Sequence, residues 1–315
     1  MSASPSGAGA HIPVLLEPVL DGLCIKADGN YIDGTFGRGG HSKAILECLG
    51  PNGRLLAIDR DPQAHTEIDK ALAADPRFEL VRGEIAELEK IAARRGLLGR
   101  VDGLLLDLGV SSPQLDAAER GFSFQSDGPL DMRMDPESGC SAAEWLASVD
   151  ERNLRRVLRE YGEEQAAGRI AAAIVSARRE QPITRTRQLA DLVASVKRKE
   201  RGEWRHPATK VFQAIRIAVN DELGQLDKAL DASIGLLRTG GRLCVISFHS
   251  LEDRRVKRFM RRNSLESEQY RGMPEVPEQH RPKLRIVGRL VTADEAEQAA
   301  NPRSRSARLR VAERC

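Results

Sequence analysis

This chain contains few aromatic residues, and its cysteines form no recognisable motif. Phe, Trp and Tyr make up 4% of its 315 residues, so a hydrophobic core has to be built from Leu, Ile, Val and Ala. The five cysteines form no C-x-x-C pair and no Cys/His cluster, which argues against a zinc site and a disulfide framework. Cys24, Cys48 and Cys244 lie in apolar contexts, and we expect buried thiols at these positions.

Long apolar runs are absent as well. The chain contains no run of about eighteen apolar residues, and residues 2–10 lack the basic segment followed by an apolar one that marks a leader. We therefore expect a cytoplasmic protein without membrane partners, with a disordered segment over 1–10. The length fits one large domain or two modest ones.

Net charge is only +3, yet the basic residues are clustered. Between residues 151 and 216, sixteen Lys and Arg residues stand against eight Asp and Glu residues. A second cluster consists of Arg254, Arg255, Lys257, Arg258, Arg261 and Arg262, and a third of Arg303, Arg305, Arg308 and Arg310. Charge runs usually form solvated helix faces, but three clusters on a nearly neutral chain indicate a polyanionic partner.

A glycine-rich segment between two apolar runs is the most informative motif. It reads Tyr31-Ile-Asp-Gly-Thr-Phe-Gly-Arg-Gly-Gly-His41, and the next apolar run ends at Asp59. The pattern predicts a strand, a tight loop, a helix and a second strand, with a ligand at the carboxyl edge of a parallel sheet. A carboxylate at Asp59 can accept hydrogen bonds from both ribose hydroxyls, which predicts a nucleoside cofactor.

The position of Asp33 separates two classes of cofactor. A dinucleotide fingerprint has the spacing G-x-G-x-x-G, whereas here an acid precedes the first glycine. An acid repels a diphosphate and can pair with the cationic amino-acid part of S-adenosylmethionine. An NAD-dependent oxidoreductase is thus a disfavoured alternative, and a purely structural turn is another.

The first third of the chain alternates predicted strands and helices. We expect strands over 31–33, 55–59, 78–82 and 101–107, and helices over 42–49, 61–74 and 85–95. Such steps predict a parallel sheet with helices on both faces. Beyond it we expect helices over 143–148, 152–161, 165–179, 187–198 and 212–237, and a strand over 242–248. The simplest fold is an α/β sheet with an inserted helical domain.

Two segments that follow predicted strands offer further candidate residues. Asp107 ends the fourth strand, where ligands bind in open parallel sheets, although a turn or cap role is the alternative. Ser111, Ser112 and Gln114 follow it as neutral donors and acceptors.

The segment from Ser247 to Asp253 contains Ser250 and Asp253 at capping-box spacing. His249 then lies at the mouth of the sheet as a base, a stacking ring or a structural histidine. Phe122, Phe124 and Phe248 are candidate rings for stacking a nucleobase, with core packing as the alternative.

Seven motifs together carry a family resemblance. They span 31–42, 56–63, 106–116, 121–124, 128–135, 206–209 and 246–253, and the segment 301–306 matches as a tail. Over these motifs, from about residue 11 to residue 315, the chain resembles the bacterial 16S rRNA (cytosine-N4)-methyltransferase family.

The resemblance implies a class I S-adenosylmethionine-dependent methyltransferase fold, a Rossmann-like doubly wound sheet, over 11–115 and 211–315. It implies an inserted all-helical substrate-recognition domain over 116–210. The implied reaction is N4-methylation of a cytidine in the P-site region of 16S rRNA in the small ribosomal subunit, with S-adenosyl-L-methionine as cofactor. Together with the argument from the residues, the expected cofactor ligands are Asp33, Gly37, Gly39, Gly40, His41, Asp59, Ile85, Asp107 and Gln114.

The motif after the fourth strand departs from that of other exocyclic-amine methyltransferases, which have Asp/Asn/Ser-Pro-Pro-aromatic. Here the matching residues are Asp107-Leu-Gly-Val110, without the stacking ring. We expect Asp107, or backbone carbonyls of the 107–113 loop, to accept the amine proton, and His249 is a second candidate catalytic residue. The expected substrate contacts are Ser111, Ser112, Phe122, Phe124 and Phe248.

Two alternatives of another kind stay open. One is a non-catalytic RNA-binding factor in ribosome assembly, and the other is a methyltransferase for a different nucleic acid. No metal ligands and no DNA partner are expected. The sequence does not determine the oligomeric state, and a homodimer is one possibility. It also does not determine whether magnesium is needed with the RNA.

Overall fold

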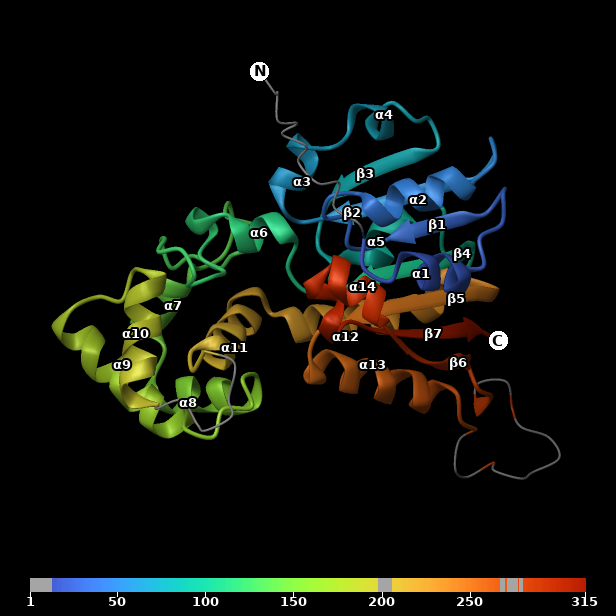
Figure 1. Ribbon diagram of the computed structural model, residues 1–315. Helices are drawn as coiled ribbons and strands as arrows, with labels where there is room; N and C mark the ends of the chain where they lie inside the picture. Colours follow the sequence, from blue (N-terminus) through green and yellow to red (C-terminus); the bar gives the residue numbers. More distant parts are fainter. Residues whose placement is uncertain (1–12, 198–205, 267–269, 271–276, 278–279) are drawn as a thin grey trace, which may run out of the picture. The chain divides into compact units, whose positions relative to one another are not determined.

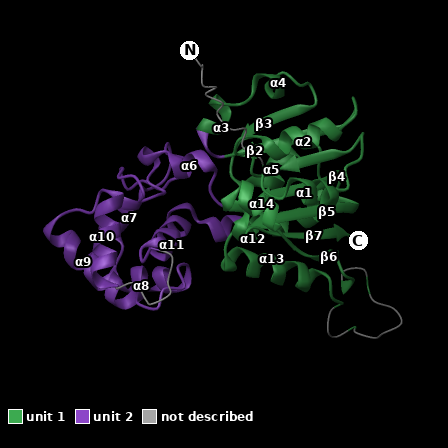
Figure 2. Cartoon of the chain, viewed as in Figure 1, with its two compact units in different colours: residues 1–59, 63–108, 226–315 green, residues 60–62, 109–225 purple. Residues whose placement is uncertain are grey.

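The computed structural model describes residues 13–197, 206–266, 270, 277 and 280–315 (Figure 1). The segment expected to be disordered, 1–10, lies outside the described residues. The chain forms two compact units (Figure 2): unit 1 comprises residues 1–59, 63–108 and 226–315, and unit 2 comprises residues 60–62 and 109–225. The domain boundaries expected at 116 and 210, and the substrate-recognition role of that segment, stay predictions.

Unit 1 is built on a seven-stranded sheet of order β3-β2-β1-β4-β5-β7-β6. The strands are β1 (Asn30–Asp33), β2 (Arg54–Asp59), β3 (Phe78–Arg82), β4 (Val101–Asp107), β5 (Leu237–Ser247), β6 (Leu284–Thr292) and β7 (Arg308–Arg314). The pairs from β3 to β5 are parallel, whereas β7 runs antiparallel to both β5 and β6. The expected parallel sheet is therefore confirmed, with one antiparallel strand that the sequence reading missed.

Helices cover both faces of this sheet. They are α1 (Leu16–Leu23), α2 (Gly40–Cys48), α3 (Pro62–Thr66), α4 (Lys70–Ala73), α5 (Leu88–Ala93), α12 (Glu222–Leu236), α13 (Ser250–Asn263) and α14 (Glu295–Ala300). Side chains of β4 alternate between two apolar clusters: Leu104 and Leu106 pack with residues of α5, α12 and α13, and Leu105 packs with residues of α1 and α2. A strand buried on both faces reads as a continuous apolar run, as β4 does.

Unit 2 is helical and has its own apolar core. Its helices are α6 (Ser112–Asp116), α7 (Ala142–Ser148), α8 (Glu151–Glu160), α9 (Ala167–Glu180), α10 (Thr186–Val196) and α11 (Thr209–Asn220). A single bridge joins Pro129 to Arg185, and the described residues of this unit contain no strand. Within the described ranges of the whole chain, no helix combines the length and apolar character that crossing a bilayer requires.

Three expected helices differ from the structure. The helix expected over 61–74 is broken, because the Asp69 carboxylate accepts hydrogen bonds from the Ala71 and Leu72 amides and caps α4. The helix expected over 212–237 is interrupted at Asp221, whose φ of 45° is left-handed. The segment expected as a helix over 85–95 begins with a 3-10 turn, η1 (Ile85–Glu87).

The cysteine expectations are partly wrong. Cys244 is buried within β5, but Cys24 and Cys48 are exposed. Both exposed residues lie at helix ends, since Cys24 follows α1 and Cys48 ends α2. Apolar neighbours in sequence do not bury a side chain there.

Candidate cofactor and methyl-transfer site

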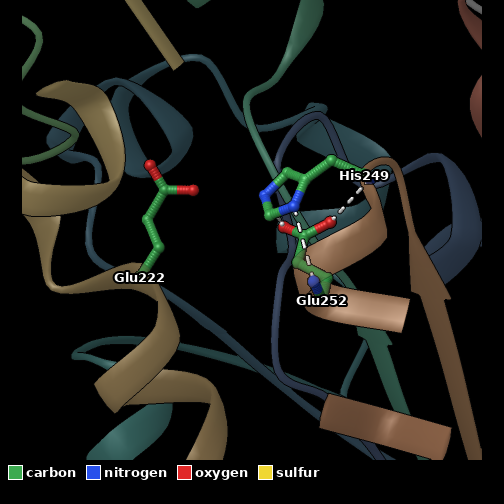
Figure 3. A group of neighbouring side chains, drawn as sticks. All are labelled: Glu222, His249 and Glu252. Atoms are coloured by element: carbon green, nitrogen blue, oxygen red, sulfur yellow. Dashed lines mark hydrogen bonds and ion pairs between the residues drawn. The ribbon is translucent and has the colours of Figure 1, made fainter. Parts of the chain in front are cut away.

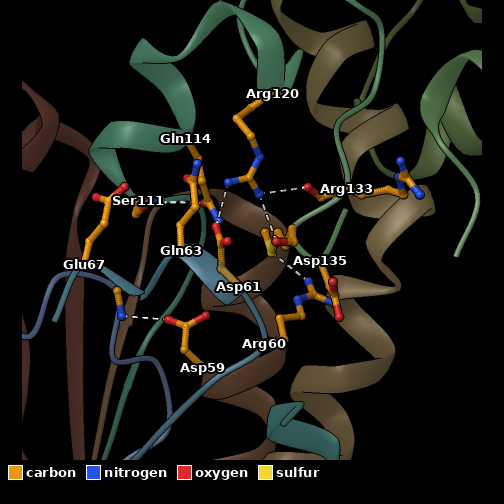
Figure 4. Close-up of polar contacts among 12 residues, drawn as sticks. Asp59, Arg60, Asp61, Gln63, Glu67, Ser111, Gln114, Arg120, Arg133 and Asp135 are labelled. Carbon is orange, nitrogen blue, oxygen red and sulfur yellow. Dashed lines mark hydrogen bonds and ion pairs between the residues drawn. The ribbon is translucent and has the colours of Figure 1, made fainter. Parts of the chain in front are cut away.

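The glycine-rich loop of unit 1 joins β1 to α2 at the carboxyl edge of the sheet. The Gly37 amide donates a 2.7 Å hydrogen bond to Asp59 Oδ2, which ties the loop to the end of β2 (Figure 4). Gly37 has a φ of +56°, and a Cβ built there would meet nothing closer than 3.9 Å. The open side of the loop is therefore at Gly37, where a ligand can approach the backbone.

The next two glycines are required by packing within the protein. A Cβ at Gly39 would lie 2.7 Å from the Phe36 ring, and one at Gly40 would lie 2.5 Å from Pro13 Cγ. Gly39 also precedes α2 with a φ of +74°. These two positions shape the loop, and their predicted contact with cofactor stays a prediction.

Asp33 is buried and braces the loop from beneath. Its Oδ2 accepts a 2.7 Å hydrogen bond from the Ser42 hydroxyl in α2, and its Oδ1 accepts one of 3.1 Å from the Thr35 amide. Burial raises the pKa of this carboxyl, and both hydrogen bonds oppose the rise. Since both oxygens are engaged and the residue is 1% exposed, its place in the structure favours a supporting role over direct pairing with a ligand.

Asp107 ends β4, and its carboxylate receives few hydrogen bonds from the protein. Its amide donates to Thr35 Oγ1 at 2.6 Å, which fixes the backbone. Oδ1 is buried without a hydrogen-bond partner, and Oδ2 lies 3.6 Å from His41 Nδ1. Burial raises the pKa of Asp107 to about 6; His41 opposes this rise, while the charges of Asp33 and Glu252 add to it.

The tautomer of His41 follows from its other ring nitrogen. Nε2 lies 2.9 Å from the Val14 carbonyl oxygen, which can only accept, so Nε2 carries a hydrogen. Nδ1 faces Asp107 Oδ2 and can donate to it only when the ring is protonated, which is the form that opposes the rise in the pKa of Asp107. This buried histidine is therefore oriented by the backbone before any ligand binds.

His249 and Glu252 form a compact pair at the start of α13 (Figure 3). Glu252 Oε2 accepts from the Phe248 amide at 2.8 Å and the His249 amide at 3.3 Å, while His249 Nδ1 accepts from the Glu252 amide at 3.4 Å. His249 Nε2 lies 3.2 Å from Glu252 Oε1 but has no partner in hydrogen-bond geometry. The ring nitrogen is thus buried and unsatisfied.

The capping box therefore lies one residue before the expected one. His249 caps α13 in place of Ser250, and Glu252 replaces Asp253 as its reciprocal partner. Asp253 instead accepts from Arg310 at 2.7 Å and from Arg308 at 3.1 Å. Because those arginines belong to the third basic cluster, part of that cluster has a structural role.

Ile85 and Phe248 occupy different surroundings in unit 1. Ile85 Cγ2 lies 3.6 Å from the position of a Cβ at Gly34, so the residue expected beside adenine is next to the glycine-rich loop. Phe248 is partly buried against the apolar cluster that includes residues of α1 and α2. The structure thus places Ile85 next to the glycine-rich loop, whereas Phe248 contributes to the core, and contact of Ile85 with adenine stays a prediction.

Gln114 lies in unit 2 within a buried polar network (Figure 4). Its Nε2 donates to Asp61 Oδ2 at 2.6 Å, and its Oε1 accepts from the Ser111 amide at 2.9 Å. Arg120 donates to the same Asp61 oxygen at 2.9 Å and to the Met134 carbonyl at 2.9 Å. The sequence reading missed this arginine and Asp61, because nothing in their local pattern marks residues 59 positions apart as partners.

The other candidate residues of unit 2 lie in three different surroundings. Ser111 precedes α6, and Ser112 is its first residue. Phe122 is 6% exposed within the core, with the Arg120 guanidinium 5.8 Å from its ring centroid. Phe124 packs against His206 and Phe212, with ring centroids 4.7 and 4.8 Å away. Base stacking by these rings stays a prediction, and the burial of Phe122 favours core packing.

The fold and the site together define a class of protein. The sheet places the antiparallel β7 between β5 and β6, unlike the all-parallel dinucleotide-binding order, and its carboxyl edge carries acids beside a glycine-rich loop. The chain is a Rossmann-like methyltransferase with S-adenosylmethionine as cofactor. A family model described as the MraW methylase family matches residues 8–315, and the chain belongs to that family. This assignment excludes the oxidoreductase alternative.

Individual relatives are similar over the whole chain. A curated "Ribosomal RNA small subunit methyltransferase H" from Thioalkalivibrio sulfidiphilus is 57% identical over 316 residues, covering 100% of this chain and 99% of the relative. A solved rRNA methylase from Streptococcus thermophilus is 13% identical, covering 97% of this chain and 99% of that one, with a TM-score of 0.40. A solved SAM-dependent methyltransferase from Aquifex aeolicus is 9% identical, covering 96% and 90%, with a TM-score of 0.41.

Proposed function

We propose that this enzyme methylates N4 of a cytidine in the P-site region of 16S rRNA in the small ribosomal subunit, and that it does so in the cytoplasm. The name of the relative that is 57% identical to this chain supports the small-subunit rRNA as substrate. The observation that carries the reaction type is the buried, unpartnered Asp107 Oδ1 at the carboxyl end of β4.

The carboxyl edge of unit 1 suits S-adenosylmethionine. The Asp59 carboxylate would accept from the ribose hydroxyls, the backbone at Gly37 would face the amino-acid part, and Ile85 would flank the adenine. When bound, the cofactor supplies an activated methyl group, and its transfer leaves a neutral thioether.

The charges on this edge favour a cation. Burial and the neighbouring charges of Asp33 and Glu252 all raise the pKa of Asp107, and His41 is the one titratable group that lowers it. A positive ligand beside Asp107 would relieve that repulsion, whereas a diphosphate would increase it. This donor set therefore fits a sulfonium cofactor and not a dinucleotide.

Asp107 would act on the cytosine amine. The lone pair of that nitrogen is delocalised into the ring, so an acceptor for its N–H returns electron density to nitrogen. As the new N–C bond forms, the amine proton passes to an Asp107 carboxylate oxygen. A carboxyl with a pKa of about 6 is ionised at neutral pH and is a better proton acceptor than an ordinary aspartate.

His249 has a different part in this proposal. Its Nε2 is buried without a partner, and Glu252 fixes the ring from the other side. A base that leaves its stack to reach the pocket needs groups that hold it there. His249 of unit 1 would supply one such contact. Phe124, Ser111 and Ser112 of unit 2 stay candidate substrate contacts.

Gln114 is assigned here to the polar network of unit 2. Both ends of its amide already bond within the protein, to Asp61 and to the Ser111 amide. The helices of unit 2 and the basic clusters would bind rRNA phosphates, which position a substrate without reading much of its sequence.

The test is methyl transfer from labelled S-adenosylmethionine. Small-subunit particles and free 16S rRNA from cells that lack this protein serve as substrates, and digestion to nucleosides identifies the product. Labelled N4-methylcytidine is the expected result. Cofactor binding with label in another nucleoside, or only in another nucleic acid, would contradict the proposal, and absence of cofactor binding would favour a non-catalytic assembly factor.

A further inference from the structure

The basic cluster of α13 separates into two sets in the structure. Arg255 forms an ion pair with Asp227 of α12, and Arg262 forms one of 3.3 Å with Asp231 of the same helix. The Arg262 guanidinium also lies 5.8 Å from the centroid of the Phe259 ring. These two arginines therefore join α13 to α12 inside unit 1.

The second set is an exposed row that we name the α13 stripe. It consists of Arg254, Lys257, Arg258 and Arg261. Their spacing of three, four and seven residues places them on one face of the helix. Val256, Phe259 and Met260 are buried and define the opposite face. The stripe thus points away from the core that holds the helix.

The stripe differs from the other basic clusters in what its side chains contact. Among the described residues, the side chains of Lys257, Arg258 and Arg261 form no ion pair with a carboxylate. In the third cluster, by contrast, Arg308 and Arg310 both bind Asp253. The positive charges of Lys257, Arg258 and Arg261 are therefore not neutralised by a carboxylate within the described residues and are available to a polyanion.

The dimensions of the stripe match a nucleic-acid backbone. At 1.5 Å per residue, the positions from 254 to 261 extend over about 10 Å, the axial length of about three nucleotides in a strand. The helix begins directly after β5, at the His249–Glu252 pair. The first residue of the stripe is therefore about one turn from residues of the proposed site.

We propose that the α13 stripe binds RNA backbone phosphates and positions the substrate strand along unit 1. The proposal rests on the proposed function, since it takes RNA as the polyanion. Lysine and arginine contacts to phosphate are expected to raise affinity without base selectivity, by releasing condensed counterions.

The test compares two double variants of the same helix. Arg258→Gln with Arg261→Gln removes two charges from the stripe, and Arg255→Gln with Arg262→Gln removes two charges that are paired with α12. The dissociation constant for deproteinised 16S rRNA is measured over a salt series, and again for small-subunit particles. Cofactor affinity and thermal unfolding report whether each variant is folded.

The stripe variant should lose about 1.4 to 1.8 from the slope of log Kd against log salt, because each phosphate contact contributes about 0.7 to 0.9. Its KM for RNA should rise about tenfold, with kcat at saturating RNA unchanged. The paired variant should keep a slope close to that of the parent. Equal slopes in the two variants would show a net-charge effect and overturn the proposal.

Two further outcomes separate this proposal from the proposed function. Loss of affinity for particles but not for free rRNA would mean that the stripe contacts a ribosomal protein, which also overturns the proposal. If the parent enzyme forms no N4-methylcytidine, the proposed function fails, yet a slope difference with RNA would still support the stripe. If the parent forms N4-methylcytidine but the two variants have equal slopes, the proposed function stands and the proposal for the α13 stripe fails.

Discussion

The two units surround an aspartate carboxylate in opposite ways. In unit 2, Asp61 is 5% exposed and receives hydrogen bonds from Gln114 and from the guanidinium of Arg120. In unit 1, Asp107 has one oxygen without a partner, and its other oxygen faces His41 at 3.6 Å. A compensated buried charge holds a structure together, whereas an uncompensated one is retained where a ligand is expected to complete it.

Asp107→Asn gives the largest expected effect and tests the unit 1 half of this comparison. The amide keeps the shape but cannot take the amine proton, so kcat should fall about a thousandfold, within the usual range for general base catalysis. In the parent, log kcat should rise with pH and reach a plateau at or below about pH 6. In the variant, this pH-dependent rise should be absent. Single-turnover methyl transfer across pH 5–8 measures both, and full turnover by the variant would contradict the assignment.

Arg120→Met tests the unit 2 half. It leaves Asp61 buried without its cation, and breaking such a pair costs about 3 to 5 kcal/mol. The free energy of unfolding, measured by chemical denaturation, should fall by that amount. Adding Asp61→Leu to the same protein should recover part of the loss, because no lone charge then stays buried. An unfolding free energy unchanged by the single substitution would mean that this network is not structural.

Asp107→Asn should also stabilise the protein at high pH. The folded pKa of Asp107 is about 6 and its ordinary value is 3.8, so the folded state binds more protons between these values. Stability is therefore lost as pH rises through this window, and the loss is complete above about pH 7. The asparagine variant cannot ionise at this position. Its free energy of unfolding should therefore exceed that of the parent by about 1 to 3 kcal/mol at pH 8, and the difference should vanish near pH 4.

Asp59→Asn tests whether the end of β2 takes the cofactor ribose. Hydrogen bonds to a charged group contribute about 1.5 to 3 kcal/mol, so the dissociation constant for S-adenosylmethionine should rise about thirtyfold. Equilibrium binding by calorimetry measures the change. The affinity for deproteinised rRNA serves as the control and should stay the same, since Asp59 is proposed to bind the cofactor and not the RNA. A cofactor affinity like that of the parent would remove Asp59 from the site.

The smallest expected effect concerns discrimination between charged and neutral cofactor. Because the Asp107 carboxylate has one oxygen without a partner, unit 1 should bind the sulfonium about fivefold more tightly than S-adenosylhomocysteine, which lacks the positive charge. Asp107→Asn should reduce that ratio, and Asp61→Asn should leave it unchanged. Competition binding at pH 8 compares the three proteins.

Much of the fold follows from local patterns. The strands over 78–82 and 101–107 are predicted with their observed bounds, since apolar runs between turn signals identify buried strands. The prediction lacked β7 because the arginines of this segment were interpreted as part of a basic tail, and it lacked β6 as well. In β7, Leu309 and Val311 alternate with arginines, so a period of two is present in a segment read only for its charge.

The candidate site divides in the same way. Asp33, Asp59 and Asp107 could be located because each ends a strand, and parallel strands end at one edge. The roles of Asp33 and Gln114 could not, because their hydrogen-bond partners depend on tertiary contacts to Ser42 and Asp61. The same limit hid Glu252, whose reciprocal bond with His249 differs by one residue from the expected box.

The place of β7 in the sheet has a consequence for synthesis. β7 lies between β5 and β6, although it is the last of the seven strands to be translated. Until it emerges, the edge of β5 has unpaired backbone groups that can associate with other chains. Translation at about 5 to 20 residues per second leaves the edge open for several seconds. A nascent chain would need the ribosome, a chaperone or its own β6 to shield it until then.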